Sequence, residues 1–363
     1  MSSISVNTIT DASGGSTTTI NGLTPSVSNM AGRNRIINGG MVFDQRNNGA
    51  AVTPSADPQY TLDRWVFQRS QASKFSTQQN AGSVTPPNGF SNYLGITSLS
   101  AYSIGSSDYF LVQQKLEGFN TADLAWGTAN AKTVTVSFWV RSSLTGTFGG
   151  AVRNSAENRS YPFSYTISVA DTWEQKSITI AGDTTGTWVG ATNGIGLSLA
   201  FGFGVGSTYS GTAGSWAGAN YASATGATSV VGTSGATFYI TGVQLEEGSV
   251  ATPFEHRQYG QELALCQRYF EKLTVTKFPL FPAGNNGVNS EGRFPFHTQK
   301  RAAPTVTKEG DMTLFLNGSS SVNTDHALNG TVYGAGLLAV IVGGSYSAST
   351  GVDSVTFLAN AEL

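Results

Sequence analysis

Strict alternation between bulky and very small side chains over residues 194–206 is the feature that most constrains the fold of this chain. Side chains of a β-strand point to opposite faces in turn, so this pattern predicts a strand with one face buried in a core. The other face carries only Gly, Ser and Ala, and permits close approach of another segment of the fold, a second sheet or a ligand. The bulky residues are Ile195, Leu197, Leu199, Phe201, Phe203 and Val205.

The same period of two recurs along most of the chain. It predicts further strands over residues 109–116, 132–143, 175–180 and 237–245, and Gly, Asn and Ser turns separate them. Charged residues make up only 12% of the 363 positions, about half of the ~25% that is typical, which argues against a helical protein. The sequence therefore predicts a mainly β protein built on a jelly roll or another β-sandwich.

One segment breaks the period. Over residues 258–271 the apolar positions Tyr259, Leu263, Cys266 and Phe270 are spaced 4, 3 and 4 apart, which predicts a short helix with one apolar stripe. The stripe either covers the sandwich or meets its own copies around a symmetry axis.

Four parts of the chain are predicted from these patterns. Residues 1–40 form a weak hairpin segment that docks onto a partner or onto copies of itself. Residues 41–257 form the jelly roll, and residues 258–272 form a connecting helix. Residues 273–363 form a small C-terminal β domain that needs neighbouring chains for its stability.

Charge and cysteine content narrow the possible partners. The formal net charge is -2, from 20 basic and 22 acidic residues without a Lys/Arg block, so we expect neither nucleic acid nor an anionic membrane as a partner. The longest apolar run, residues 335–344, is far shorter than the ~20 residues that span a bilayer, so no membrane insertion is expected. Cys266 is the single cysteine, which excludes an intrachain disulfide and suits assembly in a reducing cytosol.

Catalytic and metal-binding patterns are missing from the sequence. His256, His297 and His326 lie far apart, so no metal site and no cofactor are predicted. Cys266 and His256 could act as nucleophile and base, but a thiol in an apolar helix stripe is better explained as a buried structural residue. Glu246 and Glu247 are adjacent, and a strand would point them to opposite sides. We therefore expect no catalytic residues and no enzyme activity.

A long loop offers a different kind of chemistry. Residues 206–236 are rich in Gly, Ser, Ala and Thr, and loops of this length are uncommon unless they bind something or are disordered. Aromatic rings pack on the apolar face of a sugar, while amide side chains bond its hydroxyls. Because the segment around residue 188 has the same character, the predicted ligand-binding residues are Trp188, Tyr209, Trp216, Asn220 and Tyr221.

Several phrases, taken in their order along the chain, resemble a known family. The phrases are "ISVNTITDASGGSTTTINGLTP" (4–25), "NRIINGGMVFDQRN" (34–47), "YTLDRWVFQRS" (60–70), "VTVSFWVRSS" (134–143), "FYITGVQLEEGSVATPFEHR" (238–257), "ELALCQRYFEKL" (262–273), "KRAAPTVT" (300–307) and the terminal "AEL". In these phrases the chain is similar to tail-fibre and related appendage proteins of tailed bacteriophages.

The resemblance implies a homotrimeric virion protein that is assembled in the host cytoplasm. Residues 1–40 would attach to other virion proteins, and the jelly roll would be similar to carbohydrate-binding modules. The expected function is non-enzymatic attachment of the particle to a glycan on the host surface. One alternative is a structural virion component, such as a head or collar fibre or an adaptor, without specific sugar binding. Another is a spike that degrades polysaccharide.

Overall fold

A computed structural model describes residues 32–279, 281–283, 289–316, 319–323, 331–333, 337–343 and 351–363. The chain forms two compact units. The sandwich unit contains residues 32–42, Thr53–Gln59 and Phe67–His256, and the C-terminal unit contains Phe43–Val52, Tyr60–Val66 and the described part of Arg257–Leu363. Residues 1–31 of the predicted attachment segment lie outside the described residues. The role of this segment stays a prediction, as do the predicted domain boundaries.

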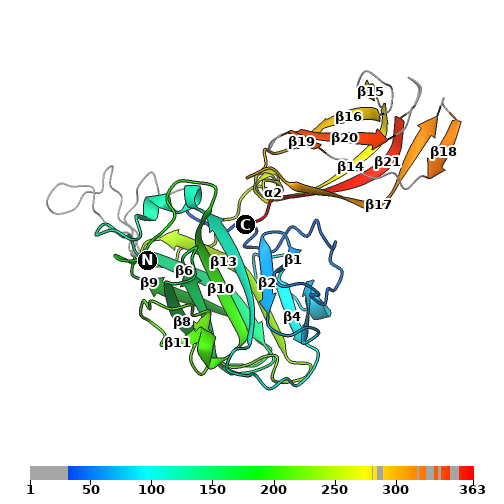
Figure 1. Ribbon diagram of the computed structural model, residues 1–363. Coiled ribbons are helices and arrows are strands. Elements are labelled where there is room, and N and C mark those ends of the chain that lie inside the picture. Colours follow the sequence, from blue (N-terminus) through cyan, green and yellow to red (C-terminus); the bar gives the residue numbers. More distant parts are fainter. Residues whose placement is uncertain are drawn as a thin grey trace, which may run out of the picture. The chain divides into compact units, whose positions relative to one another are not determined.

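Two sheets form the sandwich (Figure 1). Each strand expected from the period of two is present, and the prediction of a mainly β sandwich is confirmed. The first sheet has the order β1 (Gln59–Leu62), β2 (Trp65–Arg69), β5 (Tyr109–Glu117), β10 (Ile195–Val205), β7 (Gly146–Arg153) and β8 (Ser160–Ile167). The second has the order β3 (Phe75–Gln79), β4 (Leu94–Ser98), β13 (Thr237–Glu247), β6 (Val134–Ser142) and β9 (Glu174–Ile180).

Aromatic side chains fill the core between these sheets. The Phe203 ring on β10 lies 4.9 Å from the Phe75 ring and 6.2 Å from the Phe67 ring, and both contacts are edge-to-face. Phe110 on β5 joins the same cluster, and all four residues are buried. Full burial stabilises each such side chain by about 1.5–3 kcal/mol relative to exposure, so the alternation of β10 directly supplies the core.

The bare face of β10 is covered by a later part of the same chain. A methyl group added at Gly202 would lie 2.9 Å from the Ser223 hydroxyl oxygen, and one added at Gly149, its pairing partner on β7, would lie 2.4 Å from it. Ser223 belongs to β12 (Ser223–Ala224), which pairs in parallel with β11 (Ser210–Gly211). The loop after β10 therefore returns over the sheet, and the interpretation of this face as a site of close packing within the fold is confirmed.

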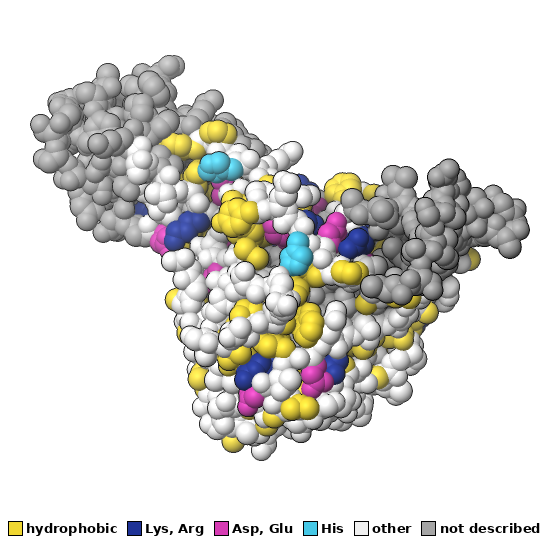
Figure 2. Space-filling model, turned by 180° about the vertical axis from the view of Figure 1, so that it is seen from behind, with side chains coloured by type: hydrophobic (Ala, Val, Ile, Leu, Met, Phe, Trp, Pro, Cys, Tyr) yellow, Lys and Arg dark blue, Asp and Glu magenta, His cyan; other side chains and the backbone are white. Residues whose placement is uncertain are grey.

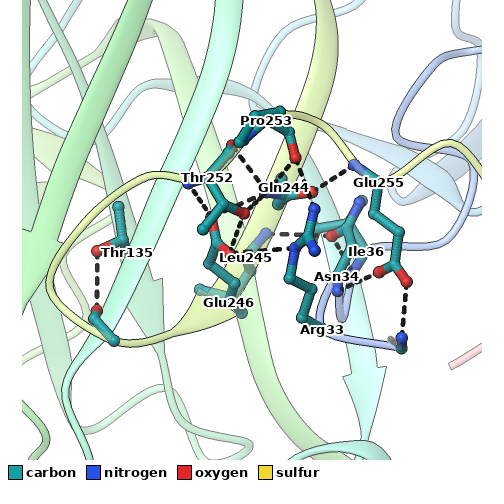
Figure 3. Close-up of polar contacts among 12 residues, drawn as sticks. Arg33, Asn34, Ile36, Thr135, Gln244, Leu245, Glu246, Thr252, Pro253 and Glu255 are labelled. Carbon is teal, nitrogen blue, oxygen red and sulfur yellow. Dashed lines mark hydrogen bonds and ion pairs between the residues drawn. The ribbon is translucent and has the colours of Figure 1, made fainter. Parts of the chain in front are cut away.

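A polar clamp fixes the first described residues to the sandwich (Figure 3). The Glu255 carboxylate accepts hydrogen bonds from the backbone N–H groups of Gly32 (2.6 Å) and Asn34 (2.7 Å). The Asn34 side-chain oxygen accepts from the N–H groups of Ile36 (2.9 Å) and Leu245 (3.2 Å). Residues 32–36 are thereby held along β13.

The carboxylate of Glu246 belongs to the same clamp. It accepts from the Thr252 N–H (2.8 Å) and from the Gln244 side chain (2.8 Å), and the Arg33 guanidinium lies 3.6 Å away. Its neighbour Glu247 pairs instead with Lys132 at 2.9 Å. Glu246 is thus a buried structural carboxylate, since protein groups satisfy its oxygens.

The C-terminal unit contains helix α2 (Tyr259–Gln267) and two four-stranded sheets. No helix among the described residues is long and apolar enough to cross a membrane. One sheet has the order β14 (Phe270–Pro279), β21 (Gly351–Asn360), β17 (Thr305–Leu316) and β18 (Ser319–Asn323). The other has the order β15 (Phe281–Ala283), β16 (Asn289–Pro295), β20 (Leu337–Gly343) and β19 (Thr331–Tyr333).

Helix α2 is shorter than the period of its sequence predicts. Phe270 already pairs with Asn360 in the ladder between β14 and β21, so strand pairing ends the helical segment early. Of the predicted stripe, Tyr259, Leu263 and Cys266 lie on the helix, and Phe270 lies on β14. Tyr259 is 68% exposed whereas Cys266 is fully buried, and contact of the stripe with further copies of the chain stays a prediction.

Buried charges hold the end of the chain in this unit. The Glu362 carboxylate accepts hydrogen bonds from Arg64 and from Arg46, the latter at 3.2 Å. The Arg64 guanidinium stacks 3.4 Å from the ring centroid of Tyr269, and that of Arg46 lies 3.6 Å from the ring of Phe270. Both guanidinium groups are thus removed from water. Glu362 pairs with both of them, and Asp63 lies 3.7 Å from Arg46 as a second carboxylate.

Asp63, next to this cluster, makes the stability of the C-terminal unit depend on pH. Burial raises the pKa of Asp63 to about 6, although Arg46 and a hydrogen bond from Gln45 oppose the rise. An unfolded aspartate titrates near pH ~3.9, so the folded state binds this proton more tightly. The free energy of unfolding therefore falls as pH rises from about 4 to about 6, by up to about 3 kcal/mol.

Asp63→Asn tests this dependence, because the amide keeps the shape of the side chain but cannot ionise. We expect the free energy of unfolding of the variant, taken relative to that of the natural chain, to increase by about 2–3 kcal/mol from pH 4 to pH 6.5. Urea unfolding of both proteins at the two pH values measures this difference. An equal stability difference at both values would contradict the assigned pKa.

Candidate functional site

A pocket of about 160 Å³ lies on the outer side of the first sheet, beside the loop that covers β10. Strands β2, β5 and β7 supply one part of its wall, and the segments after β7 and β10 supply the rest. The lining residues are Gln68, Tyr109, Leu111, Arg153, Glu157, Tyr209, Asn220 and Ala222.

Two tyrosines form an aromatic corner in this pocket. The rings of Tyr109 and Tyr209 are 5.4 Å apart at an interplanar angle of 83°. The Tyr109 hydroxyl donates a hydrogen bond to Asp57 (2.8 Å). Burial and this bond raise the pKa of Tyr109 to about 12, so the ring stays neutral at physiological pH. The corner therefore offers uncharged aromatic surface on two sides.

Arg153, at the end of β7, is the central polar group of the pocket. Its side chain is buried, and its two terminal nitrogens donate to the side-chain oxygens of Asn220 (2.8 Å) and Gln113 (2.6 Å). The Glu157 carboxylate lies 3.3 Å from one of these nitrogens. Burial lowers the pKa of Arg153, and the carboxylate of Glu157 counteracts that effect. The buried Nε has no hydrogen-bond partner among the described residues.

The hydrogen bonds of Arg153 continue on both sides. Gln113 donates to the Gln68 side-chain oxygen (2.7 Å), and Asn220 donates to Glu157 (3.1 Å). Five polar side chains are thus connected from one end of the pocket to the other. Such a network holds its donors and acceptors in place before a ligand arrives, which lowers the entropic cost of binding.

Two of the five residues predicted to bind a ligand, Tyr209 and Asn220, line this pocket. Tyr221 does not; its ring packs on Gly211, where an added methyl group would come within 2.2 Å of the ring. The other lining residues were missed from sequence. The signal for Tyr109 was its position on β5, where Tyr109, Leu111 and Gln113 share the face opposite the core residues Phe110 and Val112.

Trp188 and Trp216 lie in a separate cluster with Trp126. The three indole rings contact one another edge-to-face, at centroid distances of 4.8, 5.3 and 5.5 Å. The Trp216 N–H donates to the Ala181 carbonyl (2.8 Å), and that of Trp188 donates to the Asp183 carboxylate (3.1 Å). Because protein groups already engage the edges and N–H groups of these rings, a role in binding stays a prediction for both residues.

In the part of the chain that the structure describes, no group of three or more His, Cys, Asp or Glu residues could hold a metal ion. Burial raises the pKa of the Cys266 thiol well above its usual range, so the sulfur stays protonated rather than nucleophilic.

Charged side chains are sparse on the visible surface. Figure 2 shows Lys and Arg lying close to Asp and Glu rather than gathering into a patch of one sign.

Comparisons with known proteins concern the fold. No family model and no curated protein matches the chain. Among solved structures, a putative sugar binding protein from Bacteroides thetaiotaomicron is 10% identical, with a TM-score of 0.35, over 59% of this chain and 100% of that chain. A family 11 carbohydrate-binding module from Clostridium thermocellum is 14% identical, with a TM-score of 0.27, over 55% and 96%.

A phage protein is among these similar structures. The enzymatically active domain of tailspike protein 4 from bacteriophage CBA120 is 10% identical, with a TM-score of 0.33. The match covers 59% of this chain and only 21% of that chain. Likeness at such identities and TM-scores carries no conclusion about binding or catalysis.

Proposed function

We propose that this chain is a non-enzymatic, carbohydrate-binding virion protein that attaches a phage particle to a glycan on the host surface. The observation that carries the proposal is the pocket in which the Tyr109–Tyr209 corner meets the network of Arg153. A sugar ring has apolar C–H faces and a rim of hydroxyl groups, so it needs aromatic surface and fixed polar groups together.

The carboxylates near the pocket support binding rather than hydrolysis. Glu157 is engaged by Arg153 and Asn220, and Asp57 accepts from Tyr109. Glycoside hydrolysis commonly uses two carboxyl groups that flank the scissile bond, and Glu157 is the one carboxylate among the residues that line this pocket.

The virion role is supported by where the family-like phrases lie in the fold. Residues 34–47, 60–70 and 238–257 and the terminal "AEL" include many members of the polar clamp and the Glu362 cluster, which are structural. All pocket residues except Gln68 lie outside the phrases. A shared framework with a separate binding site is what a family of receptor-binding fibres would need.

Trimeric assembly would make weak sites sufficient. In this proposal the chain forms a homotrimer that joins other virion proteins through residues 1–40. A single site with a millimolar Kd contributes about -4 kcal/mol. Several linked sites act together, because each later contact forms at a high effective concentration.

Tyr209→Ala tests the sugar site directly. Removing one wall of the corner should weaken binding to host-surface polysaccharide by at least about tenfold, since truncated aromatic anchors commonly cost more than about 1.4 kcal/mol. Binding of the purified protein to host cells and to a glycan array measures the loss.

The matched control is Tyr259→Ala, which removes an exposed tyrosine that does not line the pocket. It should bind like the natural chain. If both variants bind equally well, the pocket is not the attachment site. If the intact protein binds no glycan at all, the structural virion role is favoured instead.

A further inference from the structure

We infer that the pocket accepts one uncharged sugar ring, as the terminal or side-branch residue of a glycan, and excludes acidic sugars. This inference rests on the proposed function and specifies the ligand class of the same site. Three properties of the pocket lead to it: its size, the angle between its tyrosines and its charge balance.

The size of the pocket limits the ligand to about one ring. Its volume is about 160 Å³. Drug-sized ligands occupy pockets of about 300–1,000 Å³, so this one is about half of the smallest of those. A run of several sugar residues would need a longer depression with further aromatic contacts.

The tyrosine geometry points the same way. A flat glycan ribbon is best served by rings that lie side by side in one plane. Here the planes of Tyr109 and Tyr209 stand at 83°, so together they form a corner rather than a platform. A corner can contact two sides of one ring, which favours the end of a chain or a branch over its middle.

Charge excludes an acidic sugar. Both terminal nitrogens of Arg153 already donate to protein oxygens, and the Glu157 carboxylate balances the guanidinium charge. Glu157 is itself 37% exposed. A sugar carboxylate would therefore meet one cation that is already paired and the carboxylate of Glu157, and like charges in a partly desolvated site repel.

Hydroxyl groups have suitable partners at both ends of the network. Gln68 accepts through its side-chain oxygen, and no described group accepts from its amide N–H₂. Glu157 offers carboxylate oxygens at the other end. A neutral sugar has hydroxyl groups that can donate to Glu157 and accept from Gln68, and it brings no charge into the pocket.

Calorimetric titration of the full-length protein tests the inference. The probes are methyl glycosides of glucose, galactose, mannose and N-acetylglucosamine, the methyl glycosides of glucuronic and galacturonic acid, and linear trisaccharides of the neutral sugars. We expect at least one neutral monosaccharide to bind within about threefold of its trisaccharide. We expect the acidic counterpart to bind at least about tenfold more weakly.

Glu157→Gln should narrow the gap between the neutral and the acidic sugar to less than about threefold, because it removes the nearest repelling charge. Glu247→Gln is the matched control. That carboxylate is also 37% exposed and also pairs with a cation, Lys132, at 2.9 Å, but it does not line the pocket. The control should keep the natural preference.

Each other outcome has a distinct meaning. Affinity that rises at least about tenfold from monosaccharide to trisaccharide, or equal binding of neutral and acidic sugars, overturns the single neutral ring but leaves the proposed function in place. A neutral preference that Glu157→Gln leaves unchanged overturns the charge argument. Failure of every neutral and acidic probe, together with failure of host polysaccharide, overturns the proposed function itself.

Discussion

Replacing Glu362 by alanine is expected to lower the free energy of unfolding of the C-terminal unit by about 3–5 kcal/mol, because a buried ion pair that loses one partner leaves an uncompensated charge. Arg64 is only 1% exposed and would lose its carboxylate in a site where water cannot replace it. Arg46 would lose the same partner but would keep Asp63, at 3.7 Å. Folded units are commonly stable by only about 5–15 kcal/mol, so the variant should lose a large part of its stability.

Urea unfolding at pH 7 measures this effect, and Glu309→Ala is its control. Glu309 also pairs with a cation, Lys272, at 2.5 Å in the same unit, but its side chain is 46% exposed. Pairs of that kind contribute about 0–1 kcal/mol. A Glu362→Ala variant that unfolds no more easily than Glu309→Ala would show that the buried cluster does not hold the chain end.

The strands could be predicted because their signal is local. A period of two is set by the backbone, so the alternation of residues 194–206 is sufficient to define β10 and its buried face. The end of helix α2 could not be predicted in the same way. It is decided by pairing between Phe270 and Asn360, which are 90 positions apart. Glu362 likewise has no pattern around it, since its partners are Arg46 and Arg64.

In the candidate site, too, residues with a local sequence signal could be predicted and residues brought together only by the fold could not. Tyr209 and Asn220 were found because an unusually long loop with aromatic residues is uncommon unless it binds something. Tyr109 and Arg153 lie on strands, where they look like any residue on the face away from the core. Trp188 and Trp216 were expected on the same grounds as Tyr209, but in the fold their rings contact each other. Sequence indicates exposed aromatics, and only the fold shows which of them meet.

We expect the second large loss of stability from Phe203→Ala, in the sandwich unit. Phe203 is fully buried, and its ring contacts those of Phe67, Phe75 and Phe110 from three other strands. Truncation of a buried Phe to Ala costs about 3–5 kcal/mol, since the cavity that remains adds to the lost transfer energy. Thermal unfolding of this unit should begin about 6–20 °C lower.

A control variant and a binding assay together distinguish loss of stability from loss of sugar binding. Phe119→Ala removes a ring that is 58% exposed, and its unfolding temperature should stay within about 2 °C of the natural value. Below its unfolding temperature Phe203→Ala should still bind sugar, because Phe203 points into the core and the pocket lies on the opposite side of the sheet. Tyr209→Ala should show the reverse, with lost binding and little lost stability. If Phe203→Ala lost affinity while still folded, the pocket would depend on the core more closely than alternation along β10 allows.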